Sequence, residues 1–460
     1  MDNFWDFSVW GWFNVLAVLL ISLLAAKALK KAVPILSASL IPTSVLGGGI
    51  LLIVAGVYKL ITGNVMFDTP FFGESGTTTL EIITYHCLAL GFVASTLKSG
   101  GGKLTKQRTA EIFNTGVTTV STYLMQAFVG FGITLLVSVI VKGFFPAAGV
   151  LLPFGYGQGT GQALNYGNIY EQDFGFVGGK SFGLTIAALG FLSASLGGVA
   201  HLYWLKKKGH ILDRGHGDHA VSMAEIEGEN EIPMQESMDK ITVQLAFIAL
   251  AYFIAQLLMI GLGSLIPGMK SVIYGFNFIL GVAAAALVKV VLNFLNRKGF
   301  VRRKHVNDFL MTRCSNFFYD LMVVAGVAAI RLGILEDYWG VMLVLGVVGL
   351  VITYIYNLFV AKRLFPAYPQ EQFLMMYGML TGTASTGIIL LREMDGDFKT
   401  PAADNMVYQN LPAIALGFPM MLLATLAPVK PGLTFVILVA FFLVLQVVLF
   451  RSFIFKRKKK

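Results

Sequence analysis

Charged residues are scarce in this chain, where Asp, Glu, Lys and Arg together make up only 13% of 460 residues. Hydrophobic residues make up 56%, and the mean hydropathy is +0.73. A soluble protein of this length cannot bury so much apolar surface, so the composition excludes a soluble globular class and predicts an all-α polytopic membrane protein. The 50 glycines agree with this, because small residues let membrane helices approach closely.

Cysteine is nearly absent too. The two present, Cys87 and Cys314, lie in or beside apolar stretches, where free thiols are favoured over the alternative of a disulfide. The net charge is +10, but the basic residues stand between apolar stretches and form no stripe, so no nucleic-acid partner is predicted. A catalytic constellation is also lacking. The G-x-S-x-G match at 179–183 lies in an apolar stretch with no strand before it, so we predict that the chain is not an enzyme.

Apolar stretches of about 20 residues, the length that crosses a bilayer, recur along the chain. The acidic N-terminus before the first of them indicates a retained span rather than a cleaved signal peptide. The predicted spans lie near 10–26, 43–61, 78–97, 113–141, 178–204, 241–266, 271–295, 308–333, 338–361, 404–426 and 431–455.

Lysine and arginine gather after the odd-numbered spans. These basic groups lie at 27–31, 98–108, 206–208, 297–304 and 362–363, whereas the loop at 62–77 holds neither residue type. Because cytoplasmic loops carry the excess of basic residues, the N-terminus is predicted to lie outside and the basic C-terminal tail in the cytoplasm. We expect a multi-pass protein of the inner (plasma) membrane.

Two short segments share one pattern. Phe154–Thr160 reads FGYGQGT and Tyr377–Thr383 reads YGMLTGT, so both fit aromatic-Gly-x-x-x-Gly-Thr. We call them the first and second glycine motifs. Both lie in apolar stretches that glycine interrupts too often for an ordinary span. A matched pair of such segments in the two halves of a chain indicates the binding site of a secondary transporter.

The halves repeat in order, since Gly91–Ala94 and Gly326–Ala329 form a second matched pair. Each half holds five spans, and an odd number inverts the second half relative to the first. Two re-entrant hairpins are therefore predicted to enter the membrane from opposite faces. The predicted organisation is a first repeat over 1–204 with a hairpin near 146–170, a solvated cytoplasmic linker over 205–240, a second repeat over 241–426 with a hairpin near 371–393, and an extra span with a basic tail over 427–460.

The chain resembles the sodium/glutamate symporter family, as a divergent member. The resemblance rests on Ile41–Gly48, the pair Met125 and Gln126, the loop Gly157–Ala163 and the layout of the second half, and it covers about 10–426. It implies a homodimer with inverted five-helix repeats, two re-entrant hairpins, and sodium-coupled import of glutamate by a hairpin-carrying domain that moves against a dimer scaffold. Three features depart from the family. Gln158 stands where the family commonly has His, 381–387 fits only loosely, and the span at 431–455 is extra.

Unwound glycine segments free backbone carbonyls for sodium, and the helix N-termini beside them attract a carboxylate. The predicted substrate-binding residues are Gln158, Gly159, Thr160, Gly161, Gln162, Thr381, Gly382, Thr383, Ser385 and Thr386, with Gln126 and Asn410. The predicted ligands of the transported, coupling sodium ion are Thr160, Thr383, Ser385 and Asp320. Close packing of helices through small residues is the alternative explanation for the glycines.

The leading prediction is a sodium-coupled symporter for glutamate or a related amino-acid anion. Sodium is favoured over protons because the predicted site is rich in neutral oxygens and poor in titratable groups. The alternative within transporters is a symporter for another carboxylate, such as a hydroxy- or dicarboxylate. A channel or receptor is disfavoured, because channels usually place identical filter segments around a symmetric pore.

Overall fold

The computed structural model describes residues 3–98, 105–209, 231, 238–275, 277–300, 303–331, 336, 338–395 and 399–454, and these residues contain helices and no β-strand. Most of the predicted linker and the basic tail lie outside them. The longer helices are α1 (Phe7–Ala32), α3 (Thr43–Thr62), α4 (Gly76–Leu97), α5 (Lys106–Ile140), α6 (Leu151–Phe174), α7 (Gly179–Lys207), α9 (Lys240–Leu265), α11 (Asn277–Arg297), α12 (Asp308–Ala328), α13 (Trp339–Leu364), α14 (Pro369–Thr381), α17 (Asn410–Leu426) and α18 (Pro431–Leu449). The shorter ones are α2 (Pro34–Ala38), α10 (Lys270–Gly275), α15 (Ala384–Arg392), α16 (Ala402–Tyr408), α19 (Arg451–Ile454) and the 3₁₀ turns η1 (Met66–Asp68), η2 (Pro70–Phe72), η3 (Pro146–Val150) and η4 (Pro267–Met269).

Nine helices in the described residues are long and apolar enough to cross a membrane, and they correspond to nine of the eleven predicted spans. Their outer faces carry large apolar side chains that the protein leaves exposed. Leu60 is 88% exposed, Val139 83% and Ile140 81%. Side chains of this kind suit a lipid solvent rather than water, so the structure supports a multi-pass membrane protein.

Two predicted spans differ from simple crossing helices. The stretch at 404–426 consists of α16 and α17, which meet at an angle of 54° and together form a tenth candidate span. Pro412 explains the break, because its ring lacks an N–H and clashes with the carbonyl of Tyr408 one turn earlier. The stretch at 308–333 is described only to Arg331 and forms α12 as far as Ala328, and this helix is not among the nine. It carries Asp308, Arg313 and Asp320, which are costly in hydrocarbon.

The chain forms two compact units, and each draws on both halves of the sequence. The first comprises Met1–Leu80, Leu104–Asp213 and Val324–Lys460, and the second comprises Glu81–Lys103 and Arg214–Val323, so that the division falls within α4 and α12. The second unit has an apolar core that includes Val93, Ile248 and Met311. It also holds the two cysteines, which are both buried and both free, as predicted.

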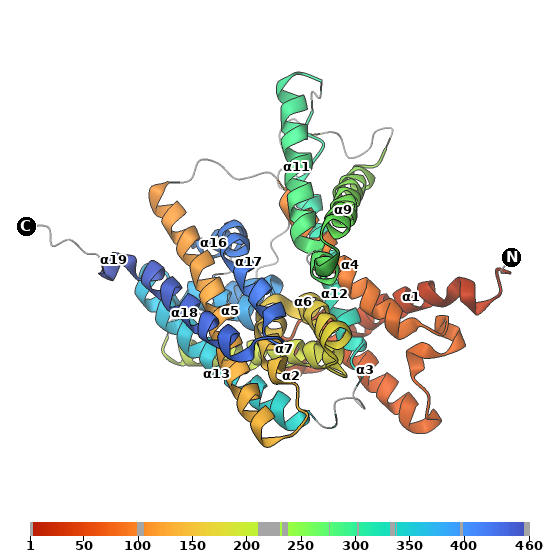
Figure 1. The fold of residues 1–460 in the computed structure, drawn as a ribbon. Coiled ribbons are helices and arrows are strands. Elements are labelled where there is room, and N and C mark those ends of the chain that lie inside the picture. Colours follow the sequence, from red (N-terminus) through yellow and green to blue (C-terminus); the bar gives the residue numbers. More distant parts are fainter. Residues whose placement is uncertain are drawn as a thin grey trace, which may run out of the picture. The chain divides into compact units, whose positions relative to one another are not determined.

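The first unit contains both glycine motifs, on α6 and α14. These two helices are buried along almost their whole length. Within the unit α6 lies along α7 (Figure 1), and α14 packs against α7, α13 and α15. A helix that is buried on all sides belongs to the interior of a bundle. The unit therefore places both motifs in its core.

Candidate functional site

The first glycine motif contains a helix break at its last glycine. Gly159 has φ 76° and ψ −171°, a conformation that is essentially restricted to glycine. The chain reverses direction there, as the stacking of the Phe154 and Tyr166 rings shows, since their centroids are 3.8 Å apart. A straight α-helix would separate residues twelve apart by about 18 Å. The segments before and after Gly159 are therefore two helical arms joined at a sharp bend.

The second motif breaks at the corresponding glycine. α14 ends at Thr381, Gly382 has φ −139° and ψ −107°, and α15 starts after Thr383. The two arms pack closely, because a Cβ added at Gly378 would lie 2.8 Å from the Cα of Gly387. Thr383 caps α15: its side-chain oxygen accepts a hydrogen bond from the Thr386 backbone N–H at 3.4 Å. Both motifs thus have the form arm, glycine, threonine, arm.

The two breaks meet at α7. A Cβ added at Gly190 would lie 2.5 Å from the carbonyl oxygen of Thr381 and 3.2 Å from the Cα of Tyr156. One turn further on, Ser193 contacts both motifs. Its hydroxyl hydrogen-bonds the Tyr156 hydroxyl at 2.8 Å, and its carbonyl accepts from the Tyr377 hydroxyl at 2.7 Å. A single face of α7 therefore holds the two broken segments together.

α5 supports the same two segments from another direction. The Tyr123 hydroxyl donates to the carbonyl of Gly157 at 3.0 Å, just before the first break. Three residues later, the Gln126 amide donates to the Leu380 carbonyl at 3.0 Å and to the Thr353 hydroxyl of α13 at 2.8 Å. Gln126 is fully buried. At the breaks some backbone carbonyls lose their helical hydrogen bonds, and side chains of α5 donate hydrogen bonds to some of these carbonyls instead.

Several buried glutamine atoms at the breaks have no hydrogen-bond partner within the described part of the chain. These are Nε2 of Gln158, Oε1 of Gln126, and both amide atoms of Gln162. Gln162 is 1% exposed. Buried polar groups are usually hydrogen-bonded, and leaving one unpaired costs about 1–3 kcal/mol. Unpaired donors and acceptors beside the breaks fit a ligand that offers both, such as a zwitterionic amino acid.

The site also fits sodium better than a transition metal. In the described ranges no group of three or more His, Cys, Asp or Glu is placed to hold a metal ion. The oxygens available near the breaks are backbone carbonyls, threonine hydroxyls and glutamine amides. Hard monovalent and divalent cations take oxygen ligands of these neutral kinds.

The base of α14 is anchored by polar side chains outside the breaks. The Tyr368 hydroxyl donates to the Glu111 carboxylate at 2.8 Å and accepts from the Asn405 amide at 2.9 Å. Burial raises the pKa of the Tyr368 hydroxyl, and its hydrogen bond to Glu111 raises it further. The hydroxyl therefore stays protonated as a donor. Arg108 completes the cluster, bonding Glu111 at 2.7 Å and Asn405 at 2.9 Å.

The model of the sodium/glutamate symporter family matches residues 11–368. The chain belongs to this family. The matched part includes the first glycine motif and ends nine residues before the second, which starts at Tyr377. No curated protein matches the chain. Membership confirms the resemblance expected from the sequence, and the geometry around the second motif comes from the structure alone.

The structure connects the two breaks through their neighbours on α5 and α7. Gln126 bonds the carbonyl next to Thr381, and Gly190 contacts both Thr381 and Tyr156, two residues before Gln158. Thr160 is buried against Gly326, whose added Cβ would lie 2.6 Å from the Thr160 Cβ. Their roles in binding substrate and sodium stay predictions.

Two further predicted residues, Asp320 and Asn410, are exposed, and two others, Thr383 and Ser385, lie at the start of α15. Asp320 is exposed and belongs to the second compact unit, whereas both glycine motifs lie in the first. Asn410 is exposed at the bend between α16 and α17, where it accepts a hydrogen bond from Gln409 at 3.1 Å. Ser385 lies in α15, but its side chain is outside the described part of the structure. Thr383 already has a structural role as the helix cap.

Sequence reasoning missed the residues that contact the two motifs or support Gln126. They are Tyr123, Tyr156, Gly190, Ser193, Gly326 and Thr353. Two of them carried a signal, since Tyr156 lies inside the first motif and Gly326 is a landmark of the repeat. The others are ordinary residues of apolar helices, and only their spatial neighbours distinguish them.

Proposed function

We propose that this chain is a sodium-coupled symporter that imports glutamate or a related amino-acid anion. The observation that carries the proposal is the buried Gln162 amide without a partner beside two broken helices. Family membership supports the same function. The proposed substrate-binding residues are those at 158–162 and 381–383 with Thr386 and Gln126, and the structure adds Ser193 and Tyr123 as residues that hold the motifs in place.

The geometry suits each part of the substrate. The arms that start at Thr160 and at Ala384 direct helix N-termini toward the breaks, where partial positive charge favours a carboxylate. The free Oε1 atoms of Gln126 and Gln162 accept hydrogen bonds from an ammonium group. Carbonyls and the Thr160 hydroxyl supply sodium ligands. Each net positive charge carried inward gains about 2.3 kcal/mol per 100 mV, so more than one sodium per substrate uses the membrane potential.

The mechanism we propose is an elevator-type alternating access. The segments around the two breaks are the tips of re-entrant hairpins that enter from opposite faces, and the repeats that contain them are inverted. The domain that carries them moves against a scaffold formed by a homodimer in the plasma membrane. The N-terminus lies outside and the C-terminus in the cytoplasm. The matching breaks at Gly159 and Gly382 support this arrangement.

The function is tested by counterflow in liposomes that contain the full chain. Labelled glutamate, aspartate, citrate and malate are offered with and without sodium. We expect exchange of glutamate or aspartate only when sodium is present. Preference for citrate or malate would select the alternative, a symporter for a hydroxy- or dicarboxylate. Exchange of none of the four, by protein that is folded, would contradict the proposal.

In the same assay Thr160→Val should lose sodium-driven exchange, and so should Thr383→Val, whereas Thr383→Ser, which keeps the cap and the hydroxyl, should retain it.

Sided labelling tests the two hairpins. The buried Cys87 and Cys314 are first replaced by alanine, and single cysteines are then placed at Gln158 and Thr383. A membrane-impermeant thiol reagent should modify the cysteine at 158 from outside and the one at 383 from the cytoplasmic side. Cysteines at Lys142 and Lys362 serve as controls for the two sides. Modification of 158 and 383 from the same side would disprove opposite entry.

A further inference from the structure

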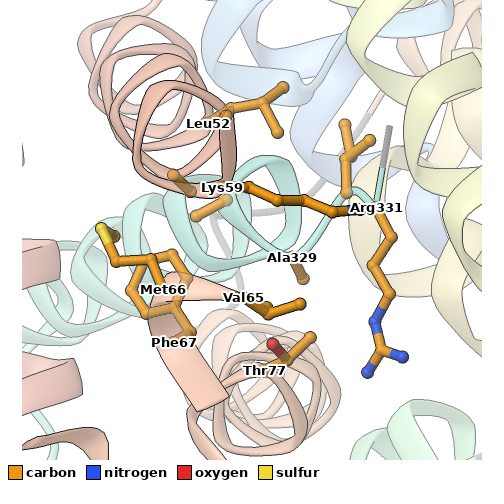
Figure 2. Close-up of a pocket in the computed structure, with 12 residues that line it drawn as sticks. Leu52, Lys59, Val65, Met66, Phe67, Thr77, Ala329 and Arg331 are labelled. Atoms are coloured by element: carbon orange, nitrogen blue, oxygen red, sulfur yellow. The ribbon is translucent and has the colours of Figure 1, made fainter. Parts of the chain in front are cut away.

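A cavity of about 210 Å³ lies in the first unit, at the end of α3 (Figure 2). Its walls are mainly apolar and include Leu52, Met66, Phe67 and Ile330. Thr77 adds a hydroxyl. The cavity therefore offers a mostly hydrocarbon lining with few polar groups, the usual character of a small-molecule site.

Two cations face this cavity. Lys59 reaches it from the last turn of α3, and Arg331 from the segment that follows α12 (Figure 2). Neither forms an ion pair with a carboxylate of the described residues. The carboxylate of Asp68 lies beside the cavity, since it accepts the backbone N–H of the lining residue Thr77 at 3.1 Å. The two cations outnumber this single carboxylate, and their excess positive charge makes the cavity attractive to an anion.

The cavity borders the surface that faces hydrocarbon. Leu52, Gly56 and Lys59 recur at helical spacing and line the cavity from one side of α3. The adjacent side of the same helix exposes large apolar residues, among them Ile53, which is 67% exposed, and Leu60, at 88%. A lipid chain lying against that side has its headgroup at the end of α3, beside Lys59.

We propose that this cavity binds an anionic phospholipid, with its phosphate between Lys59 and Arg331 and its hydrocarbon against the apolar wall and α3. Basic pockets between membrane helices bind acidic headgroups in this way. A single lysine at a helix end needs no ligand, because it extends to the interface by itself. The second cation and the apolar cavity go beyond that explanation. This inference does not rest on the proposed transport function.

The test measures lipid binding to the purified full chain in detergent by native mass spectrometry, with thermal stabilisation as a second readout. The probes are dioleoylphosphatidylglycerol, dioleoylphosphatidylcholine and inorganic phosphate. We expect phosphatidylglycerol to bind more tightly than the other two. Lys59→Gln and Arg331→Gln should each weaken its binding about fivefold, and the double variant about 25-fold.

Two further variants separate the site from general charge. Ala55→Leu fills the cavity from α3, keeps both cations and should also weaken binding, whereas Lys142→Gln removes a cation elsewhere on the first unit and should not. Unchanged binding of phosphatidylglycerol in the folded double variant would overturn the proposal. Equal binding of phosphatidylcholine would overturn it too, as would equal stabilisation by inorganic phosphate.

Discussion

Replacing Gln162 with leucine should abolish sodium-driven glutamate uptake while making the folded protein more stable. Leucine is close to glutamine in size, and the Gln162 side chain is buried with neither amide atom paired. Removing an unpaired buried polar group recovers its desolvation cost, about 1–3 kcal/mol. A ligand that binds through this amide loses both its donor and its acceptor. Uptake into liposomes and the unfolding temperature in detergent measure the two effects separately.

A matched glutamine on the other motif helix provides the control. Gln372 on α14 is equally buried, but its amide donates to the Thr115 hydroxyl at 3.1 Å and accepts from the Asn405 amide at 3.2 Å. Gln372→Leu leaves those partners unpaired and should lower the unfolding temperature. If Gln162→Leu also lowered it, Gln162 would have a structural role. If it left uptake intact, Gln162 would not bind the substrate.

The helix breaks could be predicted from the sequence because their cause is local. The conformation at Gly159 is open essentially only to glycine, and the threonine after each break suits the start of a helix. The spacing within each motif therefore fixes where the arms meet. The same reasoning predicts the Thr383 hydroxyl as a sodium ligand, which stays a prediction, and the structure shows this hydroxyl capping α15. A threonine hydroxyl suits both a helix cap and a cation ligand, so the sequence alone does not separate the two roles.

The contacts between the two motifs could not be predicted, because they join residues far apart in the chain. Gln126 donates to Leu380, 254 positions later, and the Tyr377 hydroxyl donates to Ser193, 184 positions earlier. α7 contains several small residues at helical spacing, and no pattern marks Gly190 among them. The span predicted at 308–333 stays a prediction for a different reason. Its apolar residues suggest a span, but Asp308, Arg313 and Asp320 make α12 more polar than the nine helices that are apolar enough to cross a membrane.

Gly190 is a position where one added methyl group should disturb both broken segments at once. In Gly190→Ala the new Cβ would lie 2.5 Å from the Thr381 carbonyl oxygen and 3.2 Å from the Tyr156 Cα. Both neighbours are backbone atoms, which cannot rotate away, so the two broken segments must separate from α7. Functional groups must be held within about 0.5 Å of their productive positions. We therefore expect uptake to fall at least tenfold, with weaker binding of glutamate and of sodium together.

Gly49→Ala is the control, because a Cβ added at Gly49 in the middle of α3 meets nothing within 4 Å. Alanine in a helix interior is favoured over glycine by about 0.5–1 kcal/mol, so this variant should transport normally and be no less stable. Glutamate binding by Gly190→Ala is followed by isothermal titration at several sodium concentrations. If its affinity for both ligands matched that of the unmodified chain, the two motifs would not form a joint site. Moving both broken segments away from Gly190 must affect every ligand that binds between them. If only sodium binding weakened, the substrate and the ion would therefore occupy separate sites.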